Sequence, residues 1–364
     1  MTHVEATKPL DRLPLGQNVE AKNRFMMGPL TNLQSHADGT LSDEEHYWLI
    51  LRAKGGFGMT MTCAATVQPN GQGWPGQLGV YDDKHLPGLK RLAADIKSEG
   101  SLALVQLYHG GLRADGEVTG LDLISASENE KYQAREMTAT EINETITAFV
   151  DAAKRCQKAG FDGVELHGAH GYLICQFLSP KHNQRTDEYG GDATARALFL
   201  KQILAGIRAG CGPDFIVGVR LSAERWGLAL KDMMDLAEDI MAEGSIQFLD
   251  MSLWDCFKEP EEEAFKGKPL IDWYSGLERN GVQLGVAGNL RTADDVKRAV
   301  AAGVDFVILG RSAILQHDFP KRYAMDENFT ARTTPVSPDV LRQEGLSDGF
   351  ITYMRNWDGF VADA

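Results

Sequence analysis

Residues 138–167, TATEINETITAFVDAAKRCQKAGFDGVELH, contain one complete helix-to-strand unit. Thr138 and Glu141 have the spacing of a capping box, and Gly160 lies where a C-cap glycine belongs. Apolar side chains recur at helical spacing between these two signals, which predicts an amphipathic helix. The apolar run at 162–167 then predicts a buried strand. A helix that leads directly into a buried strand is typical of a parallel sheet covered by helices.

The same alternation extends over most of the chain. The predicted strands are 24–28, 58–64, 102–107, 162–167, 215–220, 246–252, 282–287 and 305–310. The predicted helices are 43–54, 83–99, 139–159, 196–210, 231–243 and 292–302. Strand–helix alternations of this number close naturally into a (β/α)8 barrel, the TIM barrel. A doubly wound open sheet is the alternative, but no G-x-G-x-x-G fingerprint follows the first predicted strand.

The two ends of the chain extend this barrel. We expect the segment before Asn23 to form a short hairpin that plugs the bottom of the barrel, whose core covers about residues 22–320. Residues 327–364 are rich in polar side chains and form a C-terminal extension. A β/α barrel of this length is commonly one domain, so we expect residues 1–364 to form a single domain.

Composition excludes several classes of function. The 364 residues carry a net charge of −14 without a Lys/Arg cluster, which argues against nucleic-acid binding. The sequence shows neither an apolar secretory signal nor a run long enough to span a membrane. The five cysteines are scattered and form no C-x-x-C pair, which argues against a disulfide framework, a zinc ribbon and an iron–sulfur cluster. The reducing cytoplasm is therefore the expected compartment.

Residues 164–191, VELHGAHGYLICQFLSPKHNQRTDEYGG, place chemistry at the end of a predicted strand. In a TIM barrel the active site lies at the carboxyl ends of the strands. His167, His170 and Tyr172 could there hold a polarised oxygen and supply a proton. The histidines could instead bind a metal, although zinc needs a third protein ligand and the chain has no H-E-x-x-H. One buried and one surface histidine is the third interpretation.

The loops after the last two strands predict a phosphate site. Gly288 and Asn289 follow the seventh strand, and Gly310 and Arg311 follow the eighth. These loops commonly bind phosphate in this fold, where glycines permit close backbone approach and an arginine adds charge-assisted hydrogen bonds. The alternative is that the glycines only form turns.

Arg220 ends the fifth predicted strand and shares a face with Gly218, which leaves room above it. An inward-facing arginine needs an anionic partner. That partner is either a bound anion or a carboxylate on a neighbouring strand, such as Glu165.

Several segments together resemble the Old Yellow Enzyme family of FMN-dependent ene-reductases. HGAHGYLICQFLSPKHNQRTDEYGG resembles its signature block, and KNRFMMGPLT resembles its first strand. VQLYHGG resembles the third strand, and VAGNL and ILGRSAIL resemble the phosphate loops. The resemblance extends from about Pro14 to about Pro320.

The resemblance implies a bound FMN and assigns residues to it. Pro29, Thr31, Ala64, Gln106 and Arg220 would surround the isoalloxazine ring, with Leu30 and His167 also in contact with the cofactor. Gly288, Asn289, Gly310 and Arg311 would hold the phosphate. His167 and His170 would bind the substrate oxygen, Tyr172 would give the proton, and Tyr108 stands where the family often has a tryptophan over the substrate.

The function that the resemblance implies is ping-pong reduction of electron-poor alkenes or nitro compounds. NAD(P)H would bind transiently, reduce FMN and leave before the small-molecule substrate enters. Thr31 stands where one branch of the family has cysteine, and His170 where the yeast-type branch has asparagine, so the subfamily and the substrate stay open. A metal-dependent hydrolase and a flavin-binding protein without turnover are the competing hypotheses.

Overall fold

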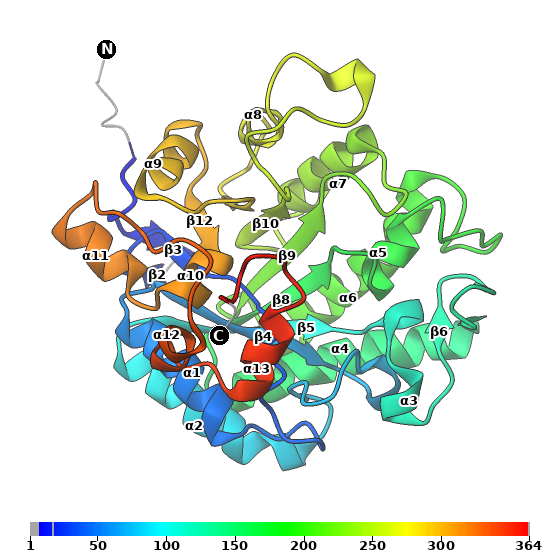
Figure 1. The fold of residues 1–364 in the computed structure, drawn as a ribbon. Helices are drawn as coiled ribbons and strands as arrows, with labels where there is room; N and C mark the ends of the chain where they lie inside the picture. Colours follow the sequence, from blue (N-terminus) through cyan, green and yellow to red (C-terminus); the bar gives the residue numbers. More distant parts are fainter. Residues whose placement is uncertain (1–6, 17, 363–364) are drawn as a thin grey trace.

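The computed structural model describes residues 7–16 and 18–362. Its centre is a closed barrel of parallel strands (Figure 1), in the order β10-β11-β12-β3-β4-β5-β8-β9. The strands are β3 (Phe25–Met27), β4 (Met59–Thr66), β5 (Leu102–Tyr108), β8 (Gly163–Gly168), β9 (Ile216–Ser222), β10 (Phe248–Ser252), β11 (Gln283–Ala287) and β12 (Phe306–Leu309). β10 pairs with both β9 and β11, which closes the sheet. The predicted (β/α)8 barrel is confirmed.

The longer helices surround this barrel where the sequence predicted them. They are α1 (Asp43–Lys54), α2 (Leu86–Ser98), α4 (Ala139–Ala159), α6 (Ala193–Cys211), α7 (Leu230–Ala242) and α9 (Ala293–Ala301). Shorter helices that the sequence did not predict are α3 (Gly116–Thr119), α5 (Leu173–Leu178), α8 (Leu270–Ser275), α10 (Arg311–Leu315), α11 (Phe319–Met325), α12 (Pro338–Gln343) and α13 (Asp348–Met354). Two short strands, β6 (Ile124–Ser125) and β7 (Arg135–Glu136), pair in the connection between β5 and α4. No helix in the described ranges has the length and hydropathy to cross a membrane.

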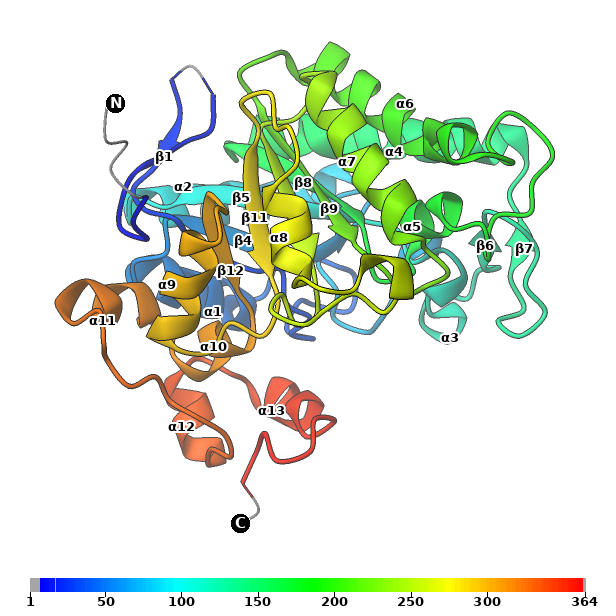
Figure 2. The same cartoon turned by 90° about the horizontal axis from the view of Figure 1, so that it is seen from above.

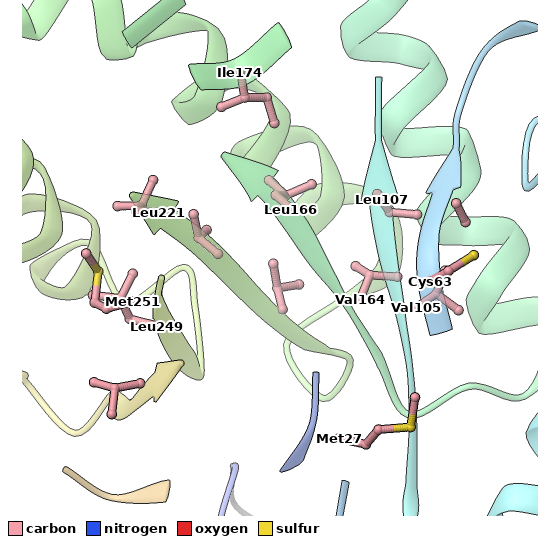
Figure 3. Packing of buried hydrophobic residues seen from close by; sticks show 14 of the residues in the cluster. Met27, Cys63, Val105, Leu107, Val164, Leu166, Ile174, Leu221, Leu249 and Met251 are labelled. Carbon is pink, nitrogen blue, oxygen red and sulfur yellow. The ribbon is translucent and has the colours of Figure 1, made fainter. Parts of the chain in front are cut away.

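Local signals explain why α4 forms. Thr138 and Glu141 make both hydrogen bonds of the predicted capping box. Gly160 ends the helix at a φ of 94°, a left-handed conformation that favours glycine. β8 then runs into the barrel, and its outward side chains Val164 and Leu166 pack beneath the helices (Figure 3). The helix and its following strand thus share one hydrophobic layer.

An N-terminal hairpin closes the amino end of the barrel. β1 (Leu13–Pro14) and β2 (Glu20–Ala21) pair antiparallel. The buried Leu13, Leu15 and Ala21 pack against a separate cluster inside the barrel that includes Phe248 and Phe306. The predicted plug is confirmed.

The space that Gly218 leaves on β9 is filled by protein. A Cβ atom at Gly218 would lie 2.0 Å from the ring of Phe248. The glycine therefore accommodates the core beside the hairpin, and the expectation of free room above it was wrong at this position.

The C-terminal extension folds over the opposite end of the barrel. Figure 2 shows α12 and α13 beyond the ends of the strand arrows, on the side away from β1. Arg52 in α1 donates a 2.6 Å hydrogen bond to the carbonyl of Glu344, and the rings of Trp48 and Phe350 lie 5.5 Å apart. The backbone N–H of Ser347 also donates to Gln34 Oε1 at 2.8 Å. These contacts fix the extension at the end where the strands terminate.

One G-x-G-x-x-G run does occur, at residues 71–76 (GQGWPG). It follows β4, the second barrel strand, and no helix begins directly after it, because α2 starts only at Leu86. A dinucleotide fingerprint needs a strand–turn–helix context, which this run lacks.

Candidate active site

A cavity of about 370 Å³ opens at the carboxyl ends of the strands. The predicted site residues on its wall are Pro29, Leu30, Thr31, His170, Arg220, Gly288, Asn289, Gly310 and Arg311. Side chains that the sequence had not assigned also line it, namely Ser252, Arg291, Tyr353, Met354 and Trp357. Trp254, which follows β10, lies there as well. The structure therefore brings residues from distant parts of the chain to one site.

His167, His170 and Tyr172 form one cluster beside this cavity. The ring centroid of His167 lies 5.0 Å from that of His170 and 5.0 Å from that of Tyr172. His170 and Gly171 have φ values of 60° and 73°, so the chain turns sharply after β8. This turn places the rings of the cluster on one side. The described residues contain no group of three or more His, Cys, Asp or Glu side chains arranged to hold a metal.

Burial keeps both imidazoles neutral. It lowers the pKa of His167 well below its ordinary value, with further contributions from His170 and Arg220. It also lowers the pKa of His170, to about 3, together with the charges of Arg220 and Arg113. The backbone N–H of Ala169 donates to His167 Nδ1 at 3.3 Å, so the ring proton of neutral His167 must be on Nε2. His167 therefore has a free N–H donor.

The second histidine is held from two sides. The Nε2 atom of His170 lies 2.7 Å from the hydroxyl of Ser252 at the end of β10. Its backbone N–H donates to the hydroxyl of Ser222 at 3.1 Å. The two serines fix the ring orientation, which the sequence spacing alone could not specify.

Arg113 is a residue of the site that the sequence did not reveal. Its guanidinium lies 4.7 Å from the ring centroid of Tyr172 and 5.1 Å from that of Trp226. It also donates to the carbonyl of His170. Because a cation over an aromatic face is attracted to the ring, Arg113 holds Tyr172 in place. The only sequence signal was an arginine shortly after the third strand.

Tyr108 supports the site from behind. It is fully buried, and its ring lies 4.5 Å from that of Tyr172 and 5.5 Å from that of Trp74. Burial and the nearby Tyr172 raise the pKa of Tyr108 well above its ordinary value. In this structure Tyr108 meets Tyr172 edge-on, outside the wall of the main cavity.

Arg220 has a carboxylate partner, which is one of the two alternatives that the sequence left open. Its Nε atom lies 3.0 Å from Oδ2 of Asp250, on the neighbouring strand β10. Glu165, the expected candidate, instead accepts a 2.6 Å hydrogen bond from Gln106. Arg220 also lines the cavity, so its positive charge is available there.

Ala64 and Gln106 are partners in the β4–β5 register. The carbonyl of Ala64 accepts a 2.7 Å hydrogen bond from Gln77, which fixes this part of β4. An amide side chain has two donors and an acceptor, so Gln106 keeps hydrogen-bonding capacity beyond its bond to Glu165.

The other end of the cavity is positively charged. Burial and the nearby Arg291 lower the pKa of Arg311. Within residues 7–16 and 18–362, no carboxylate forms an ion pair with either arginine. Two partly buried guanidinium groups without a counter-charge fit a bound phosphate. This end of the cavity therefore suits the phosphate of FMN.

The two predicted phosphate-loop glycines differ in their surroundings. A Cβ atom at Gly310 would meet only Leu30, at 3.5 Å, so this position faces open space. A Cβ atom at Gly288 would lie 2.6 Å from the backbone nitrogen of Cys256. Gly288 is thus required by the packing of the adjacent loop, and Gly310 leaves room for a ligand.

Comparison with known proteins identifies the family. Residues 12–328 match the model of the NADH:flavin oxidoreductase / NADH oxidase family. A probable NADH-dependent flavin oxidoreductase of Bacillus subtilis is 36% identical over 320 residues, which cover 85% of this chain and 86% of the relative. An NADPH dehydrogenase of Bacillus pumilus is 34% identical over 318 residues, which cover 85% and 92%.

A solved structure shows the same fold. The Old Yellow Enzyme homologue of Zymomonas mobilis superimposes with a TM-score of 0.80 at 24% identity, over 94% of this chain and 99% of the other. The family model covers most of the chain, so this chain belongs to the NADH:flavin oxidoreductase / NADH oxidase family and is an FMN-binding, NAD(P)H-dependent oxidoreductase.

Proposed function

We propose that this protein reduces the activated C=C bond of α,β-unsaturated carbonyl or nitro compounds in a ping-pong reaction. The observation that carries the proposal is the free Nε2–H of neutral His167 beside Tyr172, next to a cavity that Arg220 also lines. Bound FMN would supply the hydride chemistry that links NAD(P)H to the substrate. No step needs a separate nicotinamide-binding domain.

The side chains at the cavity activate the substrate. His167 donates its Nε2–H to the substrate oxygen, and the ring of His170 lies beside it at a centroid distance of 5.0 Å. Donors fixed before the reaction stabilise the negative charge that develops on this oxygen. Tyr172 then gives a proton to the carbon next to the activating group, while Arg113 keeps the phenol in position.

The proposal also assigns the cofactor contacts. Arg311 and Arg291 bind the phosphate, beside Gly288, Asn289 and Gly310 on the cavity wall. Arg220, which lines the cavity, would stabilise the negative charge that reduction adds to the ring. The other ring contacts are Pro29, Leu30, Thr31, Ala64 and Gln106.

A flavin-monitored assay tests this function. The purified protein should bleach its flavin absorbance with NAD(P)H under anaerobic conditions. A cyclic enone should then restore the absorbance and itself become saturated. Bleaching without restoration by any enone or nitroalkene would indicate flavin binding without this turnover.

Three further properties belong to this proposal. The hairpin and the extension both pack on the barrel, which favours one domain over residues 1–364. Cys63, Cys156, Cys175, Cys211 and Cys256 are buried and free, as suits the reducing cytoplasm. The proposed partners are small molecules, since the site is a cavity of about 370 Å³.

Replacing both histidines with alanine should abolish tight binding of phenols. A phenolate places its oxyanion where the substrate oxygen lies, and the variant lacks the N–H donor aimed at it. The charge-transfer band of the phenol–flavin complex measures this binding. His46→Ala is the matched control, because His46 lies in α1 and pairs with Asp95. A full band in the double variant at the wild-type phenol concentration would make His167 and His170 structural.

Thr31→Ala should lower the reduction potential of the flavin by about 30–60 mV. A hydrogen bond to a charged group stabilises by roughly 1.5–3 kcal/mol, and about 1.4 kcal/mol corresponds to 30 mV for two electrons. Thr31 and Tyr353 of α13 both line the cavity, and the Thr31 hydroxyl lowers the pKa of Tyr353. Tyr353→Phe keeps the hydroxyl of Thr31 and should therefore change the flavin potential less than Thr31→Ala does. Dye equilibration measures the potential, and an unchanged or raised value would remove Thr31 from the ring.

A further inference from the structure

Two carboxyl groups lie together inside the barrel next to Arg220. Glu165 on β8 and Asp250 on β10 are both fully buried. Glu165 Oε1 accepts from Gln106, and Asp250 Oδ2 lies 3.0 Å from Arg220 Nε. Glu165 Oε2 and Asp250 Oδ1 accept no hydrogen bond from the described residues, and each of the two carboxyl groups influences the pKa of the other. A proton shared between them would satisfy both.

The local charge count supports a shared proton. Two ionised carboxylates beside one guanidinium would leave a net negative charge in the low-dielectric interior, which is costly. Burial and the charge of Asp250 raise the pKa of Glu165 well above its ordinary value. Burial also raises the pKa of Asp250, although Arg220 opposes the effect. One carboxylic acid, one carboxylate and one guanidinium sum to zero.

Among the described residues, the elements around the two carboxyl groups offer no competing charge. Gln106 faces the two carboxyl groups from β5 and is neutral. His167, on the same strand as Glu165, is uncharged at neutral pH because its pKa is depressed. The core toward the hairpin is apolar and includes Leu104 and Phe248. Arg220 is therefore the charged residue that lies next to the two acids and also lines the cavity.

We propose that Glu165 and Asp250 form a proton-storing pair, which holds one proton when FMN is oxidised and takes up a second from solvent when FMN is reduced. The inference rests on the proposed position of the flavin ring beside Arg220. A hydride brings two electrons and one proton and leaves one negative charge on the ring. The second proton goes to the pair and returns to solvent when the hydride passes to the substrate.

Electrostatic balance is the reason for this coupling. While the pair carries a negative charge, the positive charge of Arg220 must compensate both the pair and the reduced ring. Protonation of the pair frees the guanidinium for the ring and restores neutrality in the buried site. The Glu165–Asp250 pair thus acts on the flavin through Arg220, as a positioning element rather than by contact with the substrate.

The pH dependence of the flavin potential tests the inference. For a two-electron couple, each proton taken up shifts the potential by about 30 mV per tenfold change in proton concentration. The wild-type holoenzyme should therefore show a slope of about 60 mV per pH unit over part of the range from about pH 6 to 9. Asp250→Asn should reduce the slope to about 30 mV, and Glu165→Gln should do the same. Glu344 is a buried carboxylate in the C-terminal extension and pairs with Arg332. The control variant Glu344→Gln should therefore keep the wild-type slope.

A direct proton count complements the slopes and needs no variant. Reduction by NAD(P)H delivers a hydride without a free proton, so an indicator dye in weak buffer should report one proton taken from solvent. The infrared C=O stretch of a protonated carboxylic acid should strengthen on reduction. A wild-type slope of about 30 mV with no proton uptake would overturn the inference.

Failure of the proposed function and failure of the proton-storing pair give different results. A protein that does not bind FMN would contradict the family placement and the proposed function. A protein that binds and reduces FMN, but whose Asp250→Asn and Glu165→Gln variants keep the wild-type slope and proton count, would contradict only the proton-storing pair.

Discussion

Tyr172→Phe is expected to slow reoxidation of the reduced enzyme by an enone by roughly 10²–10⁴-fold, the usual contribution of a positioned acid. Reduction of FMN by NAD(P)H should be nearly unchanged, because the phenol is needed only when the substrate carbon takes its proton. The ring itself is retained, so its edge contact with Tyr108 and its stacking with Arg113 persist. The loss should therefore report the hydroxyl alone.

Stopped-flow measurement of the two half-reactions separates these effects. Tyr189→Phe is the matched control, since Tyr189 does not line the cavity and its hydroxyl lies 2.9 Å from Gln202 on α6. The control should show wild-type rates in both directions. Equal slowing of both half-reactions in Tyr172→Phe would instead indicate a packing role for the phenol.

Arg311→Ala should weaken FMN binding by roughly tenfold to a hundredfold. A charge-assisted contact is worth about 1.5–3 kcal/mol, and no carboxylate in the described part of the chain competes for this arginine. The rate per bound FMN should stay close to wild type, because Arg311 follows β12, at the phosphate end of the cavity. Titration of the dialysed protein with FMN measures the affinity.

Two further variants sharpen this prediction. Arg291→Ala should act in the same direction, since Arg291 shares the cavity and lowers the pKa of Arg311. Arg322→Ala removes an exposed arginine that pairs with Asp318 and should leave FMN affinity unchanged. An unaltered affinity in Arg311→Ala would remove this residue from the phosphate site.

The barrel and the histidine cluster could be predicted because their signals are local. Apolar periodicity placed α1 and α4 at their observed bounds, and the strand ends fell within a few residues. In a closed parallel barrel the carboxyl ends of all strands lie at one face. Locating His167, Arg220 and Arg311 at such ends was therefore enough to bring them together.

Other parts of the site depend on contacts that no local pattern encodes. Asp250 lies in an apolar strand, and its pairing with Arg220 follows from the order of the strands around the barrel. Tyr353 and Trp357 belong to a polar extension whose docking depends on Arg52, far away in the sequence. Gly288 looks like a phosphate-loop glycine, yet its neighbour is the backbone of Cys256. Only the folded chain shows these partners.

The most direct test of the proposed function is anaerobic reoxidation of the NAD(P)H-reduced enzyme, followed in wild type and in Tyr172→Phe against the same enone. We expect rapid return of the oxidised flavin spectrum in wild type, formation of the saturated product, and a return slowed by roughly 10²–10⁴-fold in the variant. A reduced wild-type enzyme that no enone or nitroalkene reoxidises would contradict the proposed reduction of activated alkenes.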